Sequence, residues 1–432
     1  MNSYMKAIFL ILIILLPLVY TPFFHSQSTL AYPTGMTFFP FTSSILTNFV
    51  EGVINVYNLS IGSSYLPNGA YLTSGNASLQ LNSILNGKFW AQNVALFHEI
   101  NSKEFLVTMV VNFWNLSGPF ENYPNTTTYE GLGVYCYQGP SFILKTPFSL
   151  ILYMNSSNGL EFGYIVNNTL HTYLKLPFPG EFTLGGFTAG LPNDLELVWG
   201  GPGGGSTVYI NEVASEELFY ESSNKLSIVP SAISVGLDTA ESAYGISVTS
   251  NLDNIFHPFA TISKGYNTPS ILWPIPPSIT VTQVNKTVNV KVSINGKPLV
   301  NQEVEVLYPT LTGFKVGYEN ITNSSGLVTF PNASTALYII YYPGNFSLAT
   351  AYSLSSSSAP ILQSIASKFI STFQSLTNFL KTYNFKKALS SDFNHIKYKG
   401  YSTYNINLVL IEYISAFAIG VLISAILIKY KF

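Results

Sequence analysis

The sequence predicts an all-β fold for most of its 432 residues, with helices expected only near the C-terminal end. Two observations support this prediction. Short β-branched and aromatic runs alternate with Asn-Gly, Ser-Gly and Pro-Asn turns over more than 300 residues, and helical periodicity appears only after about residue 358. Two long apolar segments, one at each end, stand apart from this pattern and predict that the chain is exported.

Residues 1–31 are expected to be a signal peptide. A start with one positive charge, Met1 to Lys6, precedes the apolar run Ala7 to Tyr20, and small polar residues lead to a predicted cleavage site after Ala31. The apolar run is too short to span a bilayer comfortably.

Residues 32–277 are predicted to form a sandwich-like β domain. The segment Ser78 to Leu85, followed by the turn residues Asn86 and Gly87, is typical of its strands. A proline cluster predicts a stiff linker at the end of this domain: Pro269, Pro274, Pro276 and Pro277.

Residues 278–352 repeat the strand-turn pattern on a smaller scale. Predicted strands occur at 279–282, 287–292, 303–307 and 327–330, with turns at Asn295-Gly296 and at 323–326. The segment resembles the small immunoglobulin-like repeats of prokaryotic surface proteins, and this resemblance implies a small β-sandwich that acts as a spacer.

A helical stalk is expected over residues 353–406 and one transmembrane helix over 407–429. Apolar residues recur at helical spacing from Ile361 to Phe373, which predicts a helix lying against the membrane or self-associating with another copy. Leu408 to Ile428 covers about 30 Å of hydrocarbon at about 1.5 Å per residue. Lys429 and Lys431 follow, so the short tail is expected in the cytoplasm and the rest outside the cell membrane.

Composition also points to an external protein that works in acid. Only 9% of residues are charged and the net charge is −2, so a basic nucleic-acid-binding surface is not expected. A surface with few ionisable groups changes little with pH.

The single cysteine, Cys136, predicts a packed small side chain and no intrachain disulfide. Eleven glycosylation sequons predict a glycoprotein, although many are also ordinary turn asparagines: Asn58, Asn76, Asn115, Asn125, Asn155, Asn167, Asn285, Asn320, Asn323, Asn332 and Asn345.

Missing motifs narrow the candidate chemistry. The sequence has no Gly-x-Ser-x-Gly, no Walker-type Gly-Lys-Ser/Thr and no His-Glu-x-x-His, so no metal or cofactor is predicted. Carboxyl groups titrate at low pH, and an acid hydrolase needs one ionised and one protonated. Four candidate catalytic carboxyls lie in two informative stretches: Asp194, Glu196, Asp238 and Glu241. Asp194 and Glu196 are expected to share one face of a strand, next to a glycine-rich loop at 200–205.

The region from 32 to about 265 resembles the thermopsin family, secreted acid proteases of heat- and acid-loving archaea. The matching segments are Ala77–Asn82, Phe89–Val94, Phe113–Ser117, Leu160–Tyr164, Glu196–Gly201 and Asp238–Tyr244. The resemblance implies endopeptidase activity in strong acid on protein or peptide substrates, of aspartic type but unrelated to pepsin. Some thermopsins have Asp where this chain has Asn93 and Asn112, so either those carboxyls are dispensable or this copy is impaired.

The expected catalytic pair is Asp194 with Asp238, supported by Glu196 and Glu241. Asp238 and Glu241 also have capping-box spacing and are alternatively the start of a short helix. Trp90, Trp114 and Trp199 are expected in the core. The alternative functions are an inactive, adhesive surface glycoprotein that binds through the same β domain, and a carbohydrate-binding or glycoside-cleaving sandwich.

Overall fold

The computed structural model describes residues 31–41, 43–310, 313–335 and 337–355, all of them strands, turns or loops. The all-β prediction is therefore confirmed for this part of the chain. The expected signal peptide and transmembrane helix, and all but residues 353–355 of the expected stalk, lie outside the described residues. Within the described ranges no helix is long and apolar enough to cross a membrane.

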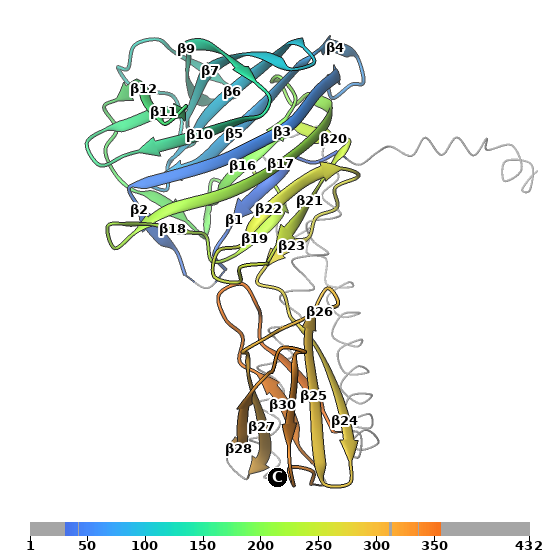
Figure 1. The fold of residues 1–432 in the computed structure, drawn as a ribbon. Helices are drawn as coiled ribbons and strands as arrows, with labels where there is room; N and C mark the ends of the chain where they lie inside the picture. Colours follow the sequence, from blue (N-terminus) through green and yellow to red (C-terminus); the bar gives the residue numbers. More distant parts are fainter. Residues whose placement is uncertain (1–30, 42, 311–312, 336, 356–432) are drawn as a thin grey trace, which may run out of the picture. The chain divides into compact units, whose positions relative to one another are not determined.

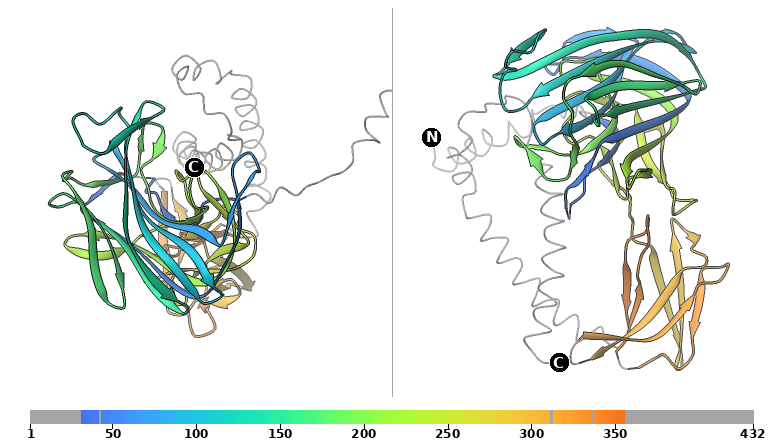
Figure 2. Two further views of the ribbon diagram at one scale, coloured as in Figure 1. Left: turned by 90° about the horizontal axis from the view of Figure 1, so that it is seen from above. Right: turned by 90° about the vertical axis from the view of Figure 1, so that its left-hand side faces the viewer.

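The chain divides into two compact units, residues 1–275 and 276–432, which are considered separately. The first unit contains two large, strongly twisted sheets that form a sandwich (Figures 1 and 2). Sheet I has the order β23-β19-β1-β16-β5-β6-β7-β9-β8, with β13 and β2 alongside, and sheet II has the order β12-β11-β10-β3-β17-β22-β21, with β18, β20 and β4 alongside.

The strands of sheet I are β1 (Thr34–Phe38), β2 (Ile45–Thr47), β5 (Asn76–Leu85), β6 (Phe89–Asn101), β7 (Glu104–Asn115), β8 (Thr126–Tyr129), β9 (Leu132–Lys145), β13 (Phe182–Leu184), β16 (Leu195–Gly200), β19 (Ala232–Val235) and β23 (Ile271–Trp273). Those of sheet II are β3 (Phe49–Tyr65), β4 (Tyr71–Ser74), β10 (Phe148–Asn155), β11 (Leu160–Val166), β12 (Thr169–Leu176), β17 (Thr207–Ser222), β18 (Lys225–Ile228), β20 (Ser242–Tyr244), β21 (Ile246–Asn251) and β22 (Phe259–Lys264). A separate hairpin pairs β14 (Phe187–Thr188) with β15 (Leu191–Pro192).

Local sequence explains the hairpins. Asn86 and Gly87, in the three-residue loop between β5 and β6, have φ angles of 55° and 54°, and the main-chain N–H of Lys88 donates to the carbonyl of Leu85 at 3.0 Å, so these two residues are the central positions of a β-turn with positive φ at both. Asn tolerates this left-handed region better than other residues with a side chain, and Gly has no Cβ to clash. The turn sets the register in which β5 and β6 pair along their whole length, from Leu85 with Phe89 to Asn76 with His98.

The core lies between the two sheets. Alternate residues of β7 are fully buried, from Phe105 to Phe113, because successive side chains of a strand point to opposite faces. Contacts across the sandwich are close: the ring centroids of Phe97 on β6 and Phe148 on β10 are 6.0 Å apart. A Cβ placed on Gly52 of β3 would lie 2.9 Å from Cδ1 of Leu197 on β16, so a larger residue at this position would require the buried Leu197 side chain to shift.

The second unit contains two four-stranded sheets. One joins β24 (Ser278–Val284), β25 (Thr287–Ile294), β26 (Lys297–Pro298) and β29 (Leu327–Phe330). The other has the order β28 (Gly313–Ile321), β27 (Glu303–Thr310), β30 (Ile339–Tyr342) and β31 (Ala351–Leu354). Inward-facing residues such as Val290, Val306 and Ile340 are fully buried and give this unit its own core.

Candidate functional site

Three of the four predicted carboxyls meet on the outward face of sheet I. One oxygen each of Asp194, Glu196 and Asp238 lies within 4.8 Å of the others. Asp194 immediately precedes β16 and Glu196 is its second residue, so the expected shared face is observed. Asp238 comes from a separate segment more than 40 residues later in the chain.

The segment Gly236–Glu241 carries Asp238 to this face. It leaves β19 in sheet I and leads to β20 in sheet II, so it crosses the outward face of β16 as it changes sheets. The crossing is tight, since a Cβ on Gly236 would lie 2.5 Å from Oε2 of Glu196. The alternative interpretation of Asp238 and Glu241 as the start of a helix is wrong, because this segment contains only bends and irregular backbone.

Glu196 is held by donors to both of its oxygens. Asn82 Nδ2 on β5 donates to Oε1 at 2.9 Å, and the hydroxyl of Thr239 also contacts Oε1. The main-chain N–H of Leu237 donates to Oε2 at 3.0 Å. Three donors compensate negative charge on this buried side chain and fix its orientation.

Asp194 and Asp238 have a different environment. All four of their side-chain oxygens are shielded from solvent and make no contact with hydrogen-bond geometry among the described residues, although the main-chain N–H of Leu237 lies next to Asp194. Burial, reinforced by the nearby charge of Glu196, raises the pKa of Asp194 well above its usual range. Burial, followed by the charges of Asp194 and Glu196, does the same to the pKa of Asp238. Carboxyls this close cannot all ionise, so the cluster retains protons in acid and well above the usual pKa of Asp.

Glu241, the fourth candidate, lies beside the cluster and is partly exposed. Its Oε1 accepts a hydrogen bond from the main-chain N–H of Gly205 at 3.0 Å, and its Oε2 one from Gln80 Nε2 at 3.4 Å. The glycine-rich loop is therefore used to bring a main-chain N–H to a carboxylate. Gly205 has a φ of 69°, a conformation that a residue with a side chain rarely adopts.

A row of polar side chains extends from Glu196 across sheet I. Each of its members is the register partner of the next: Glu196 on β16, Asn82 on β5, Gln92 on β6, Asn112 on β7 and Cys136 on β9. Three of the segments that resemble thermopsins, Ala77–Asn82, Phe89–Val94 and Glu196–Gly201, therefore contribute to this row. Asn82 and Gln92 were not among the predicted site residues. The polar residues Ser78, Gln80 and Asn82, which alternate with Leu79 and Leu81, were the available signal.

Gln80 links this row to Glu241. Its Oε1 accepts hydrogen bonds from Asn82 Nδ2 at 3.2 Å and from Gln92 Nε2 at 3.0 Å, while its Nε2 donates to Ser78 Oγ at 2.9 Å. A buried amide that uses both its donor and its acceptor is rigid.

The two asparagines that replace aspartates in some thermopsins are separated by the sheet. Asn112 belongs to the polar row, but Asn93 points into the core and is 0% exposed. Its Nδ2 donates to the carbonyls of Tyr153 and Gly163 at 2.9 and 2.8 Å, and its Oδ1 accepts from Tyr173 Oη at 2.8 Å. Asn93 therefore ties β6 to the opposite sheet and takes no part in the carboxyl cluster.

The other aromatic and cysteine predictions have mixed outcomes. Trp199 is fully buried in the core, as expected. Trp90 and Trp114 lie next to each other on the outward face of sheet I and are partly exposed, so their assignment to the core is wrong. Cys136 is exposed, because it occupies the outward position of β9, and it is not a packed core side chain.

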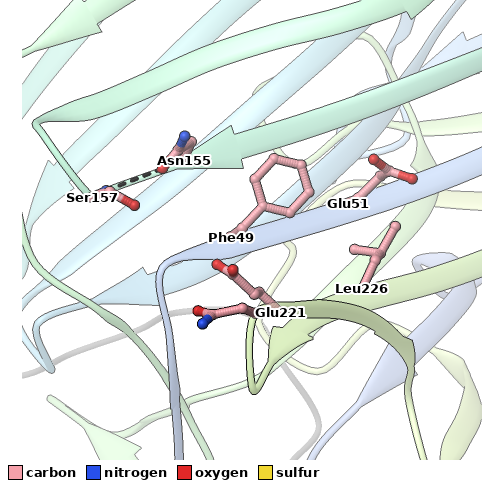
Figure 3. Close-up of a pocket in the computed structure, with 7 residues that line it drawn as sticks. Phe49, Glu51, Asn155, Ser157, Glu221 and Leu226 are labelled. Atoms are coloured by element: carbon pink, nitrogen blue, oxygen red, sulfur yellow. Dashed lines mark hydrogen bonds between the residues drawn. The ribbon is translucent and has the colours of Figure 1, made fainter.

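A separate hollow of about 400 Å³ lies on sheet II (Figure 3). It is lined by Phe49, Glu51, Asn155, Ser157, Glu221, Asn224 and Leu226. The carboxyl cluster contributes no residue to it.

The cluster of Asp194, Glu196 and Asp238 has the ligand set of a divalent-cation site, because hard cations prefer carboxylate oxygens. Such a site requires ionised carboxylates, and burial together with mutual repulsion raises the pKa of Asp194 and of Asp238, which opposes full ionisation of the cluster in acid. In acid, the arrangement favours holding and exchanging protons over holding a metal.

Comparisons with known proteins agree with these motifs. The family described as Thermopsin matches residues 19–246. Thermopsin from Sulfolobus acidocaldarius is 43% identical over 63 residues, which are 14% of this chain and 18% of the relative, so the match spans about a fifth of that protein. The crystal structure of scytalido-glutamic peptidase with a transition state analog inhibitor aligns with a TM-score of 0.27 and 10% identity over 54% of this chain and 98% of that one. Since the family match covers more than half of the sequence and includes the carboxyl cluster, the chain belongs to the thermopsin family.

Proposed function

We propose that the protein is an acid endopeptidase whose catalytic groups are Asp194 and Asp238, positioned by Glu196. The observation that carries the proposal is the convergence of three carboxyls within 4.8 Å, where burial and the neighbouring charges raise the pKa of Asp194 and of Asp238, so that this pair holds a proton in acid. Family membership supports it. Such a pair provides a general acid and a general base in the same pH range.

The reaction requires one proton on the pair. The ionised carboxylate accepts a proton from water as the water oxygen bonds to the peptide carbonyl carbon, while the protonated partner donates its proton to the carbonyl oxygen. The resulting tetrahedral diol then transfers one hydroxyl proton to the pair, and the pair protonates the amide nitrogen as the C–N bond breaks. The products are a carboxylic acid and an amine, and the pair again holds one proton.

Access to the pair depends on the segment Gly236–Glu241. The oxygens of Asp194 and Asp238 are shielded, and this segment covers Glu196. We propose that substrate binding displaces it at its partly exposed end, where Glu241 is held by Gly205 and Gln80. Glu241 then acts in binding and positioning, and Asp194 and Asp238 act in the chemical step.

The test is digestion of a denatured protein by the full-length chain across acid pH. Asp194→Asn and Asp238→Asn should each reduce kcat at least about 100-fold, the usual scale for general acid–base groups, without unfolding the protein. Glu241→Gln should raise KM more than it lowers kcat. Glu161→Gln, which removes an exposed ion pair with Lys175, is the matched control and should change neither.

The outcomes separate the alternatives. Folded Asn variants that both cleave at the wild-type rate refute the proposed pair. A folded wild-type chain that cleaves nothing in acid supports the adhesive alternative. Release of reducing sugar from a polysaccharide supports the glycoside-cleaving one.

We further propose that the protein is a glycoprotein held on the cell membrane by residues 407–429, with the immunoglobulin-like spacer and a stalk between the anchor and the β domain. The apolar run Leu408 to Ile428 and the two lysines after it support this location. The protein should remain with membranes after a high-salt wash, and deletion of residues 407–432 should release it. Recovery of the intact chain in the soluble fraction would contradict the tether.

A further inference from the structure

Two carboxyls that play no part in the proposed reaction lie inside the sandwich. Glu212 and Glu216 are on β17 and are both 0% exposed. They occupy inward positions on one face of β17. The remaining residues on this face are apolar and buried: Val208, Ile210, Ala214 and Leu218. A strand that presents two acids to the core is unusual, because an ionised carboxylate is strongly disfavoured there.

The described residues compensate charge on either group only weakly. All four side-chain oxygens lack a hydrogen-bond partner within the described ranges. The indole N–H of Trp199 on β16 is the polar group next to Glu212, and the main-chain N–H of Met36 on β1 is the one next to Glu216, but neither contact has hydrogen-bond geometry.

The elements packed against β17 are β3, β22, β18, β20, β1, β16, β2 and β21. Their described buried residues that face the core are mostly apolar: Val50, Ile54, Val56, Leu59, Ala260, Ile262, Ile228, Ala243, Met36, Phe38, Leu197, Trp199, Ile246 and Val248. Glu212 raises the pKa of Glu216 further, and Tyr220 is a neutral phenol farther along the same face of β17. The other titratable groups of these strands are on outward faces or strand ends: Glu51, Tyr57, Tyr65, Glu196, Tyr209, Glu217, Glu221, Lys225, Tyr244 and Lys264.

We propose that Glu212 and Glu216 are an acid lock of the sandwich: the two sheets pack stably only while both carboxyls carry protons, and the fold loosens as the pH approaches neutrality. The lock is independent of catalysis, because the two residues face the core and the candidate site lies on the outward face of sheet I. It would keep the chain from acting as a protease before it reaches an acidic environment.

The direction of the pH dependence follows from proton binding in the two states. Burial raises the pKa of both carboxyls in the folded chain, while in the unfolded chain it stays at about 4.3. Below about pH 4 both states are protonated and the full stability is present. Above it, the unfolded chain releases protons that the folded chain keeps, so the unfolding equilibrium constant rises about tenfold per pH unit for each carboxyl. The two groups together give about 100-fold per pH unit.

Denaturant unfolding of the full-length chain between pH 3 and pH 7 tests the lock. Glu212→Gln with Glu216→Gln replaces each protonated carboxyl by a neutral side chain of the same shape. In this double variant the unfolding equilibrium constant should rise about 100-fold less per pH unit than in the wild type, because two groups no longer titrate. The variant should keep its proteolytic activity in acid. Asp194 and Asp238 contribute with the same sign, so Asp194→Asn with Asp238→Asn should retain the Glu212 and Glu216 part of the slope but lose activity.

Two further measurements cover a variant that folds poorly. The apolar pair Glu212→Leu with Glu216→Met should flatten the same slope. Infrared spectroscopy of the wild-type protein at pH 6 should show a carbonyl band of buried protonated carboxyls that weakens in either double variant. The proposal is overturned if both variants at Glu212 and Glu216 keep the wild-type slope, or if neither weakens the infrared band. Neither result bears on the catalytic pair.

Discussion

Asn93 provides a test of how the sandwich is held together, because its amide donates two hydrogen bonds that a carboxyl cannot reproduce. Nδ2 reaches the carbonyls of Tyr153 and Gly163, which come from two different strands of the opposite sheet. In Asn93→Asp, a protonated carboxyl has a single O–H, so one of these carbonyls loses its donor. An ionised carboxylate has none.

The expected magnitude follows from the contacts. Removal of one partner from a buried hydrogen bond costs about 1–3 kcal/mol, so Asn93→Asp should lower the free energy of unfolding by that amount at pH 3. Asn93→Ala should lower it by about 3 kcal/mol or more, since it also leaves the hydroxyl of Tyr173 unpaired. Near pH 6 the Asp variant should lose more, because burial opposes its ionisation.

Denaturant unfolding at pH 3 and pH 6, with proteolytic activity measured on the same samples, distinguishes a structural role from a catalytic one. Asn112→Asp is the matched control, because Asn112 is on the outward face and partly exposed. The reasoning is refuted if Asn93→Asp is as stable as wild type, or if it changes kcat while the fold is intact.

Three other perturbations probe the site and the two units. Asn82→Ala removes the donor to Glu196 and Thr239 and should lower activity more than tenfold, with circular dichroism to show that the fold is retained. Excess EDTA should leave acid proteolysis unchanged because the cluster acts through protons; loss of activity that added Ca²⁺ restores would instead assign a metal to Asp194, Glu196 and Asp238. Gly326→Ala places a Cβ 2.5 Å from the carbonyl oxygen of Val292 at a φ of 69°, so it should lower the thermal midpoint of the second unit by several degrees, while proteolytic activity stays at the wild-type level.

Much of the fold could be predicted from residue order, because strand formation depends on local alternation and turn chemistry. The segment Ser78 to Leu85 and its Asn-Gly turn appear as β5 and the β5–β6 hairpin. Asp194 and Glu196 were expected on one face because a strand repeats every two residues, and they lie there. The four carboxyls and the motif segments were therefore identified without coordinates.

The remaining features depend on which face of each strand meets the core, and alternation alone leaves that choice open. Asn93 is next to Gln92 in sequence, yet one points into the sandwich and the other into the outward polar row. In the sequence, Glu212 and Glu216 occur at the alternate positions that Val208 and Leu218 also occupy, so the strand pattern places all four on one face. Only the packing of β17 against β16 and β1 shows that the two acids are enclosed.

Local pattern thus predicted the all-β fold of the described part of the chain, which residues alternate, and which carboxyls were available for acid chemistry. Tertiary structure decided which of them meet, because Asp238 reaches Glu196 only through a segment that changes sheets. The raised pKa values of Asp194 and Asp238 are also a tertiary property, since burial and neighbouring charges raise them and both arise only after the two sheets have packed.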